Sequence, residues 1–143
     1  MSGTPARLEE KLKAIPPDLL PLKPNDTWSI KENIGHLTDL EPLWQGRLED
    51  IINGEIELRP TDLMNQKTDL ANHNDTPLVM LLEEFRAIRA QTIAQLKTLD
   101  EATISKTALH PRLKTPMRTM DLFIFVAEHD DHHLARITEL SIS

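Results

Sequence analysis

Hydrophobic residues recur at intervals of three and four along four stretches of the chain, which is the pattern of amphipathic helices. The predicted helices cover about residues 5 to 15, 30 to 53, 77 to 99 and 116 to 140. No stretch shows the regular alternation of apolar and polar residues that predicts a β-strand. We therefore predict an all-α fold: a four-helix up-down bundle with long connecting loops and a short N-terminal helix, built as a single domain over residues 1 to 143.

Local signals mark where these helices begin and end. Ser29 and Glu32 have the spacing of a capping box, in which two side chains bind the free amides of the first turn. Asn53-Gly54 favours a left-handed helix end. Thr76-Pro77 and Thr115-Pro116 each place a good capping residue before a proline, so we expect the third and fourth helices to begin there.

The long polar stretch over residues 55 to 75 has no clear periodicity and predicts an irregular crossover loop. Pro42 lies inside the second helix and cannot donate a hydrogen bond to the carbonyl of Thr38. We therefore expect a kink at this point.

Composition narrows the classes of function. The net charge is −7 with acids and bases interspersed, which disfavours nucleic-acid binding because phosphate contacts need a basic face. A helix needs about 20 consecutive apolar residues to span a bilayer, and no apolar run in this chain approaches that length. The N-terminal residues show neither the apolar core of a signal peptide nor a basic leader. We thus expect no nucleic-acid partner, no membrane insertion and a cytoplasmic location. The chain has no cysteine, so any metal must be bound by nitrogen or oxygen.

Histidines interrupt the apolar stripes of two helices. His129 and His133 are four residues apart and therefore share one face of the fourth helix, which otherwise carries core residues such as Val126. His132 turns away from that face. His36 interrupts the stripe of the second helix, and packing the two stripes together could bring it opposite the pair.

Two interpretations of these histidines compete. A single histidine on an apolar face is more often a core residue hydrogen-bonded to a carbonyl or carboxylate, and this is the simpler interpretation of His36 alone. Three converging imidazoles are harder to explain as packing, because burying unpaired polar groups costs a few kcal/mol each and protonated rings repel one another. A divalent cation bound by His36, His129 and His133 would remove both difficulties.

Two segments resemble the DinB-like (YfiT-type) superfamily of metal-dependent hydrolases and thiol-dependent transferases. They are "WSIKENIGHLTDLEPLW" and "HPRLKTPMRTMDLFIFVAEHDDHHLARI". The resemblance implies a four-helix bundle, often dimeric, with metal ligands at His36, His129 and His133. It implies zinc or nickel as the metal, with iron and manganese as further candidates. Pro42 departs from the pattern, and Lys114 stands where a glycine is expected.

A three-histidine site leaves open coordination positions, as catalytic metal sites do. Such a site could activate water for hydrolysis, or ionise a low-molecular-weight thiol that attacks an electrophile; in either case the partner is a small-molecule substrate. Asp39 and Glu32 are candidate accessory groups, as bases or as partners that orient an imidazole, although Glu32 also fits the capping box. Asp130 is expected to be solvated or paired with Arg136.

Two classes of function therefore stand side by side. The first is a metal-dependent hydrolase or thiol S-transferase. The second is a non-catalytic bundle that binds a metal or a partner, as a stress-related or dimerisation module.

Overall fold

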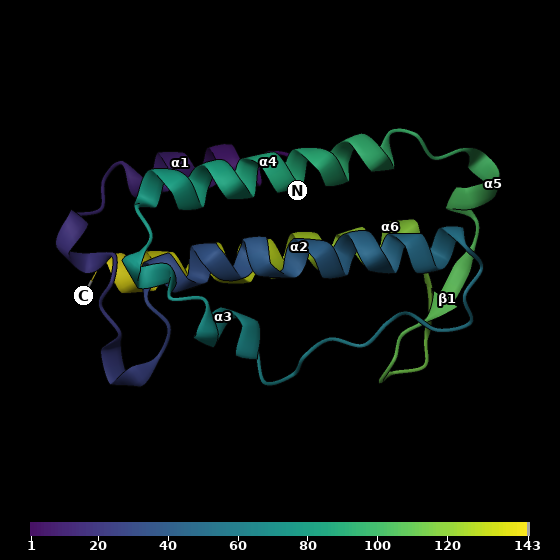
Figure 1. Cartoon of the computed structure of the whole chain (residues 1–143). Coiled ribbons are helices and arrows are strands. Elements are labelled where there is room, and N and C mark those ends of the chain that lie inside the picture. The colour runs from purple at the N-terminus through teal and green to yellow at the C-terminus, as the bar shows by residue number, and fades with distance from the viewer. Residues whose placement is uncertain (143) are drawn as a thin grey trace.

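The computed structural model describes residues 1–142 and confirms the predicted four-helix bundle. The four bundle helices are α1 (Thr4–Leu12), α2 (Ile30–Ile52), α4 (Leu78–Leu96) and α6 (Thr119–Ser141). Helix α2 packs against α4 and α6, and α1 packs against the same two helices from the other side (Figure 1). Within residues 1–142, none of the helices is long and apolar enough to cross a membrane.

Short elements lie between the bundle helices, where the hydrophobic pattern predicts loops or, for residues 116 to 118, the start of the fourth helix. They are η1 (Pro17–Leu19), η2 (Pro24–Asp26), α3 (Gln66–Leu70), η3 (His73–Asp75), α5 (Glu101–Ile104), β1 (Thr107–Leu109) and β2 (Pro116–Arg118). The expectation of an irregular crossover is therefore wrong for residues 66 to 75, and the expectation of no strand is wrong for β1 and β2. These elements are three to five residues long, too short to show a period.

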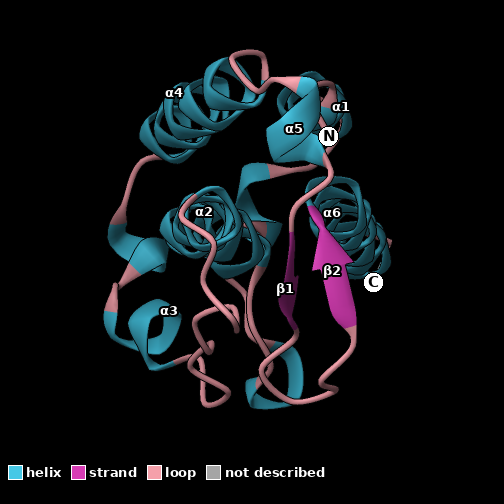
Figure 2. Ribbon diagram, turned by 90° about the vertical axis from the view of Figure 1, so that its right-hand side faces the viewer, coloured by secondary structure: helices cyan, strands magenta, loops and turns pink. Residues whose placement is uncertain are grey.

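The two strands form an antiparallel pair beside the end of α2, visible in Figure 2. The amide of Leu58 donates to the carbonyl of Leu109, and the amide of Leu109 donates to the carbonyl of Ile56. These bonds hold the chain leaving α2 against β1. In the turn between the strands, Lys114 has φ +58°, which explains why glycine is the expected residue there.

The start of the fourth helix differs from the prediction. Pro116 lies in β2, and a residue that precedes proline disfavours helical backbone angles. Helix α6 begins at Thr119 instead. Arg118 and Asp121 form the capping interaction, in which the Asp121 carboxylate accepts the Arg118 backbone amide at 3.0 Å.

The signals at the two ends of α2 are confirmed. The Ser29 hydroxyl accepts the Glu32 amide at 3.0 Å while the Glu32 carboxylate accepts the Ser29 amide at 3.1 Å. At the other end Gly54 has φ +75°, and the Glu55 amide donates to the Asp50 carbonyl, which closes the helix in a Schellman motif. Between these ends α2 is a single helix through Pro42.

The apolar core consists of two clusters at opposite ends of the bundle. The larger contains Leu8, Leu12, Ile15, Leu20, Ile30, Ile34, Leu37, Leu81, Phe85, Leu134, Ile137 and Leu140. The second contains Trp44, Leu48, Ile51, Leu58, Ala108, Leu122 and Val126. In α2, α4 and α6 the residues between the two clusters include charged side chains, so the core has a polar layer at mid-height.

Arg89 of α4 is the centre of this polar layer and is 1% exposed. Its guanidinium donates two bonds to Glu41 of α2, at 2.7 and 3.1 Å, and two to Asp130 of α6, at 2.6 and 2.9 Å. Burial opposes the charged form, but these hydrogen bonds hold the pKa of Arg89 above its ordinary value. The Thr4 hydroxyl also donates to Asp130, which ties α1 to the same layer.

This arrangement corrects the expectation for Asp130. The carboxylate is 1% exposed and bound to Arg89, whereas Arg136 pairs with Glu139. The prediction followed the position of Asp130 beside the apolar stripe of α6. The buried partner on another helix was not visible in that pattern.

Replacing Arg89 by methionine should destabilise the protein by about 3–5 kcal/mol, because two carboxylates would remain buried without a counter-charge. Arg86→Met is the matched control on the same helix, since Arg86 is exposed and makes only a surface pair with Glu9. Urea unfolding measures both. Equal midpoints for the two variants would show that the buried network is not a determinant of stability.

Candidate metal centre

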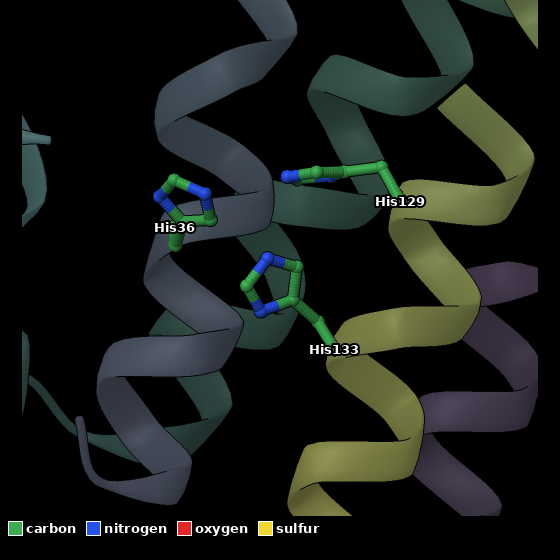
Figure 3. A group of neighbouring side chains, drawn as sticks. All are labelled: His36, His129 and His133. Atoms are coloured by element: carbon green, nitrogen blue, oxygen red, sulfur yellow. The ribbon is translucent and has the colours of Figure 1, made fainter. Parts of the chain in front are cut away.

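Three imidazoles converge between α2 and α6. His36 extends from α2 and His129 and His133 extend from successive turns of α6, with the rings facing a common space (Figure 3). One nitrogen from each ring lies within 4.8 Å of the others. The ring centroids are 5.3 Å apart for His36 and His129, 4.7 Å for His36 and His133, and 4.6 Å for His129 and His133.

These rings are neutral near pH 7. Burial, followed by the proximity of His129, lowers the pKa of His36 to about 4. Burial also lowers the pKa of His129 to about 4, against the opposing effect of Asp130. For His133, burial and the two other imidazoles lower the pKa to about 2. Neutral imidazoles are the form that binds a metal ion.

A chain of hydrogen bonds orients His36. Its Nδ1 lies 2.9 Å from the Thr68 hydroxyl, which donates in turn to the Asp39 carboxylate at 2.8 Å. His73 also places Nε2 2.8 Å from the same Asp39 oxygen. Because the Thr68 proton goes to Asp39, Thr68 accepts from His36, so His36 carries its proton on Nδ1 and leaves Nε2 free to bind a metal.

His133 is oriented in the same manner. Its Nδ1 lies 2.8 Å from Oδ1 of Asn33, whose amide nitrogen donates to the Ser29 carbonyl at 2.9 Å. Asn33 therefore presents its oxygen to the ring, and His133 also carries its proton on Nδ1. Outer partners of this kind are typical of metal-ligating histidines, because they fix the tautomer and the ring plane.

The His129 ring lacks such a partner. Among the described residues, its buried Nδ1 has no hydrogen-bond acceptor or donor. Edge contacts hold the ring instead, with the Trp44 ring 5.5 Å and the His133 ring 4.6 Å away. A buried polar atom without a partner costs about 1–3 kcal/mol, a penalty that a ligand can offset.

Two glycines allow the long connector between α2 and α4 to lie close to α2. A Cβ on Gly35 would be 2.3 Å from the His73 ring, and a Cβ on Gly46 would be 2.2 Å from the Arg59 guanidinium. Gly35 directly precedes the metal-ligand candidate His36. The missing side chain thus makes room for the His73–Asp39 contact behind that ligand.

A cavity of about 670 Å³ opens over the three imidazoles. Helices α2 and α6 form its floor, and the segment before α2, the connector before α3 and the β1–β2 turn form its walls. Trp28 directly precedes the Ser29 cap of α2 and lines the cavity. It donates Nε1–H to Asp69 at 2.8 Å, and its ring also lies 4.5 Å from the ring of His36.

The predicted accessory residues lie at two different places. Glu32 is 5% exposed and binds Ser29, Lys23 and Asn74, so it forms the cap of α2. Asp39 lies behind His36, at the far side of Thr68. Their catalytic roles stay predictions.

Sequence patterns did not indicate Asn33, Thr68 or His73 as parts of this site. Asn33 is three residues before His36 and on its face, so its spacing was the available signal. Thr68 and His73 lie in the crossover, and their contacts depend on how that segment folds over α2. His110, the first residue of the C-terminal segment quoted above, also lines the cavity.

The donor set fits a divalent ion. Nitrogens bound at about 2.0–2.1 Å to a tetrahedral ion are about 3.4 Å apart. The three imidazole nitrogens here all lie within 4.8 Å of one another, which is compatible with that separation. Two of the three imidazoles have outer partners, and the third has a nitrogen that lacks one. Three protein ligands leave at least one position open towards the cavity.

The family of the chain follows from its sequence over residues 1–137, which match the DinB superfamily. The chain belongs to the DinB superfamily. The resemblance of the two histidine-containing segments is thereby confirmed, and both lie inside the matched residues. No curated protein matches this DinB superfamily member.

The fold of this DinB superfamily member is also that of a solved structure. YfiT from Bacillus subtilis, described as a probable metal-dependent hydrolase with an unusual four-helix bundle topology, superposes with a TM-score of 0.83. The two sequences are 22% identical, and the match covers 98% of this chain and 81% of YfiT. At this identity the likeness establishes the shared fold.

Gly35→Ala should destabilise the protein by about 1–3 kcal/mol, because the added methyl group overlaps the His73 ring. It should also displace the Asp39–Thr68 chain and weaken metal binding. Gly3→Ala is the control, since a Cβ there meets no atom within 4 Å. Urea unfolding and a metal titration measure the two effects; a Gly35→Ala protein as stable as the control contradicts the close approach.

Proposed function

We propose that this protein is a metal-dependent hydrolase of a small-molecule substrate, with His36, His129 and His133 as the metal ligands. The observation that carries the proposal is the convergence of three buried, neutral imidazoles beneath a cavity of about 670 Å³. Structural metal sites are closed by four protein ligands, whereas catalytic sites keep a position for water or substrate. YfiT, which shares the fold, is described as a probable metal-dependent hydrolase, and this supports the same reaction class.

The residues around the ion have separable roles. When bound, a divalent ion would act as a Lewis acid and lower the pKa of a water molecule bound to it. Thr68 and Asn33 hold the rings of His36 and His133 through Nδ1, which would leave Nε2 free to bind an ion, and Asp39 would act through Thr68 as a positioning residue. Trp28 and Trp44 flank the rings and give this part of the cavity an apolar wall. Imidazole ligands suit zinc and nickel, which we propose as the metals, with iron and manganese as alternatives.

Thiol-dependent S-transfer is the second candidate. The cavity volume favours it, because about 670 Å³ accommodates two small reactants together. The chain has no cysteine, so the thiol must enter as a co-substrate. In this reaction the thiol sulfur forms a bond to an electrophilic carbon, the thiol proton is released, and the leaving group departs with the bonding pair.

Turnover tests distinguish the two reactions from a binding protein without activity. Zinc- and nickel-loaded protein would be assayed with a panel of esters, amides and phosphoesters, and then with a thiol and chlorodinitrobenzene as the electrophile. Hydrolysis without thiol supports the first candidate, and strictly thiol-dependent product supports the second. Metal binding without turnover in either panel supports the non-catalytic binding module.

His129→Ala should abolish stoichiometric metal binding, because it removes one of three ligands. The loss should exceed the roughly 10- to 100-fold drop that typically follows removal of an outer hydrogen-bond partner. His132→Ala is the matched control, since His132 is an exposed neighbour on α6 and is outside the converging group. Elemental analysis and isothermal titration measure both. One ion retained by His129→Ala, or lost by His132→Ala, would contradict the assignment.

Lower pH should destabilise the metal-free protein. Unfolded histidines bind protons below about pH 6.5, whereas His36 and His129 in the folded protein resist protonation down to about pH 4. The unfolded state therefore binds more protons between these values, and stability falls as the pH falls from 6.5 to 4.

Added zinc should raise the Tm at neutral pH, and the increase should persist to about pH 5 and fade near pH 4, where the ligand nitrogens become protonated. Thermal melts across this pH range test both effects. The Tm of metal-free His129→Leu should depend less steeply on pH than the Tm of the metal-free wild-type protein, because one buried histidine is removed. A Tm unchanged by zinc at pH 7 would contradict the site.

A further inference from the structure

The end of the cavity beside the β1–β2 turn is basic, in contrast to the acidic chain as a whole. Arg47 of α2 and Arg112 of the turn line this end. The Arg47 guanidinium lies 5.8 Å from the Trp44 ring, and the Trp44 ring lies 5.5 Å from the imidazole of His129. One aromatic ring thus separates the basic end from the nearest imidazole, so a single small molecule can contact both.

Arg47 is a buried cation that makes no direct ion pair among the described residues; burial lowers its pKa, although the nearby Asp50 favours its charged form. Arg47 is 4% exposed, and its Nε–H donates to the Arg59 carbonyl at 2.9 Å. Within the part of the chain that the structure describes, no carboxylate oxygen lies within 4.0 Å of it, because Asp50 pairs with Arg59 instead. Its guanidinium lies 5.8 Å from the Trp44 ring, so it is held against an aromatic wall of the cavity.

His110 adds a neutral hydrogen-bond donor beside the two arginines. Its Nδ1 accepts the backbone amides of Arg112 at 3.1 Å and Leu113 at 3.0 Å. The ring proton is therefore on Nε2, which has no partner among residues 1–142. Burial, then the nearby Arg47 and Arg112, lower the pKa of His110 and keep the ring neutral.

The other charged groups lining the cavity are already engaged. Arg136 pairs with Glu139 at 2.8 Å. The two carboxylate oxygens of Asp62 accept the amides of Met64 and Gln66. Arg47 and Arg112 are therefore the cations that remain available to a ligand.

We propose that Arg47, Arg112 and His110 bind the carboxylate or phosphate group of an elongated substrate whose other end reaches the three imidazoles. Between the two ends, the Trp44 and Phe125 rings, 5.9 Å apart, contact the apolar body of the substrate. A buried arginine suits this role because its planar guanidinium can donate two parallel bonds to an oxyanion. The substrate class rests on the proposed function, whereas the oxyanion site does not need the metal.

The test uses metal-free protein at pH 7.5 and the intrinsic fluorescence of Trp28 and Trp44, the two tryptophans of the chain, which both line the cavity. The probes are 3-phenylpropionate, phenyl phosphate and the neutral 3-phenylpropanamide. We expect each anion to bind about tenfold or more tightly than the amide, as hydrogen bonds to charged groups imply. The tighter of the two anions identifies carboxylate or phosphate as the preferred group.

Arg112→Gln and Arg47→Gln should each weaken binding of the anions by about tenfold and leave binding of the amide unchanged. Arg86→Gln is the matched control, an exposed arginine of α4 outside the cavity. If Arg47→Gln fails to fold, Arg112→Gln in the exposed turn decides the question. Equal affinity for acid and amide, or anion binding unaffected by Arg112→Gln, overturns the proposal.

The outcome is independent of the metal site. Arginine-dependent anion binding by a protein that binds no zinc or nickel would leave the oxyanion site standing and remove the proposed hydrolase. Stoichiometric metal binding by a protein that does not prefer the anions to the amide would leave the metal site standing and remove the oxyanion site.

Discussion

The arrangement of the bundle depends on one buried guanidinium. Arg89 can be charged in the core only if Glu41 and Asp130 are both within hydrogen-bond distance, because an unpaired buried charge costs several kcal/mol. This requirement sets the heights of α2, α4 and α6 relative to one another. Glu41 is little more than one turn after His36, and Asp130 directly follows His129. The register that pairs Arg89 therefore also places the imidazoles of α2 and α6 opposite each other.

The second determinant is the connector that covers α2. Gly35 and Gly46 let it approach the helix, and Thr68 and His73 then reach Asp39 behind His36. The ligand candidates are thus held from two sides, by the bundle and by the connector. Burial in this setting keeps the imidazoles neutral, so the same packing that buries them leaves their nitrogens available to a cation.

The period of apolar residues was enough to predict the four helices and the shared face of His129 and His133, and the spacing of Ser29 and Glu32 was enough to predict the cap of α2. It could not predict β1 and β2, because three-residue strands contain no repeat. It also could not predict that Thr68 would orient His36 or that Asp130 would meet Arg89. Those contacts join residues 32 and 41 positions apart and depend on the tertiary register.

Anomalous X-ray diffraction at the zinc or nickel absorption edge, on crystals of the metal-loaded protein, tests the central claim most directly. The account predicts one strong anomalous peak between α2 and α6, with nitrogens of His36, His129 and His133 at about 2.0–2.1 Å. It also predicts that the His36–Thr68 and His133–Asn33 hydrogen bonds persist around the ion. A peak elsewhere on the molecule, or an ion bound by fewer than three of these imidazoles, would contradict it.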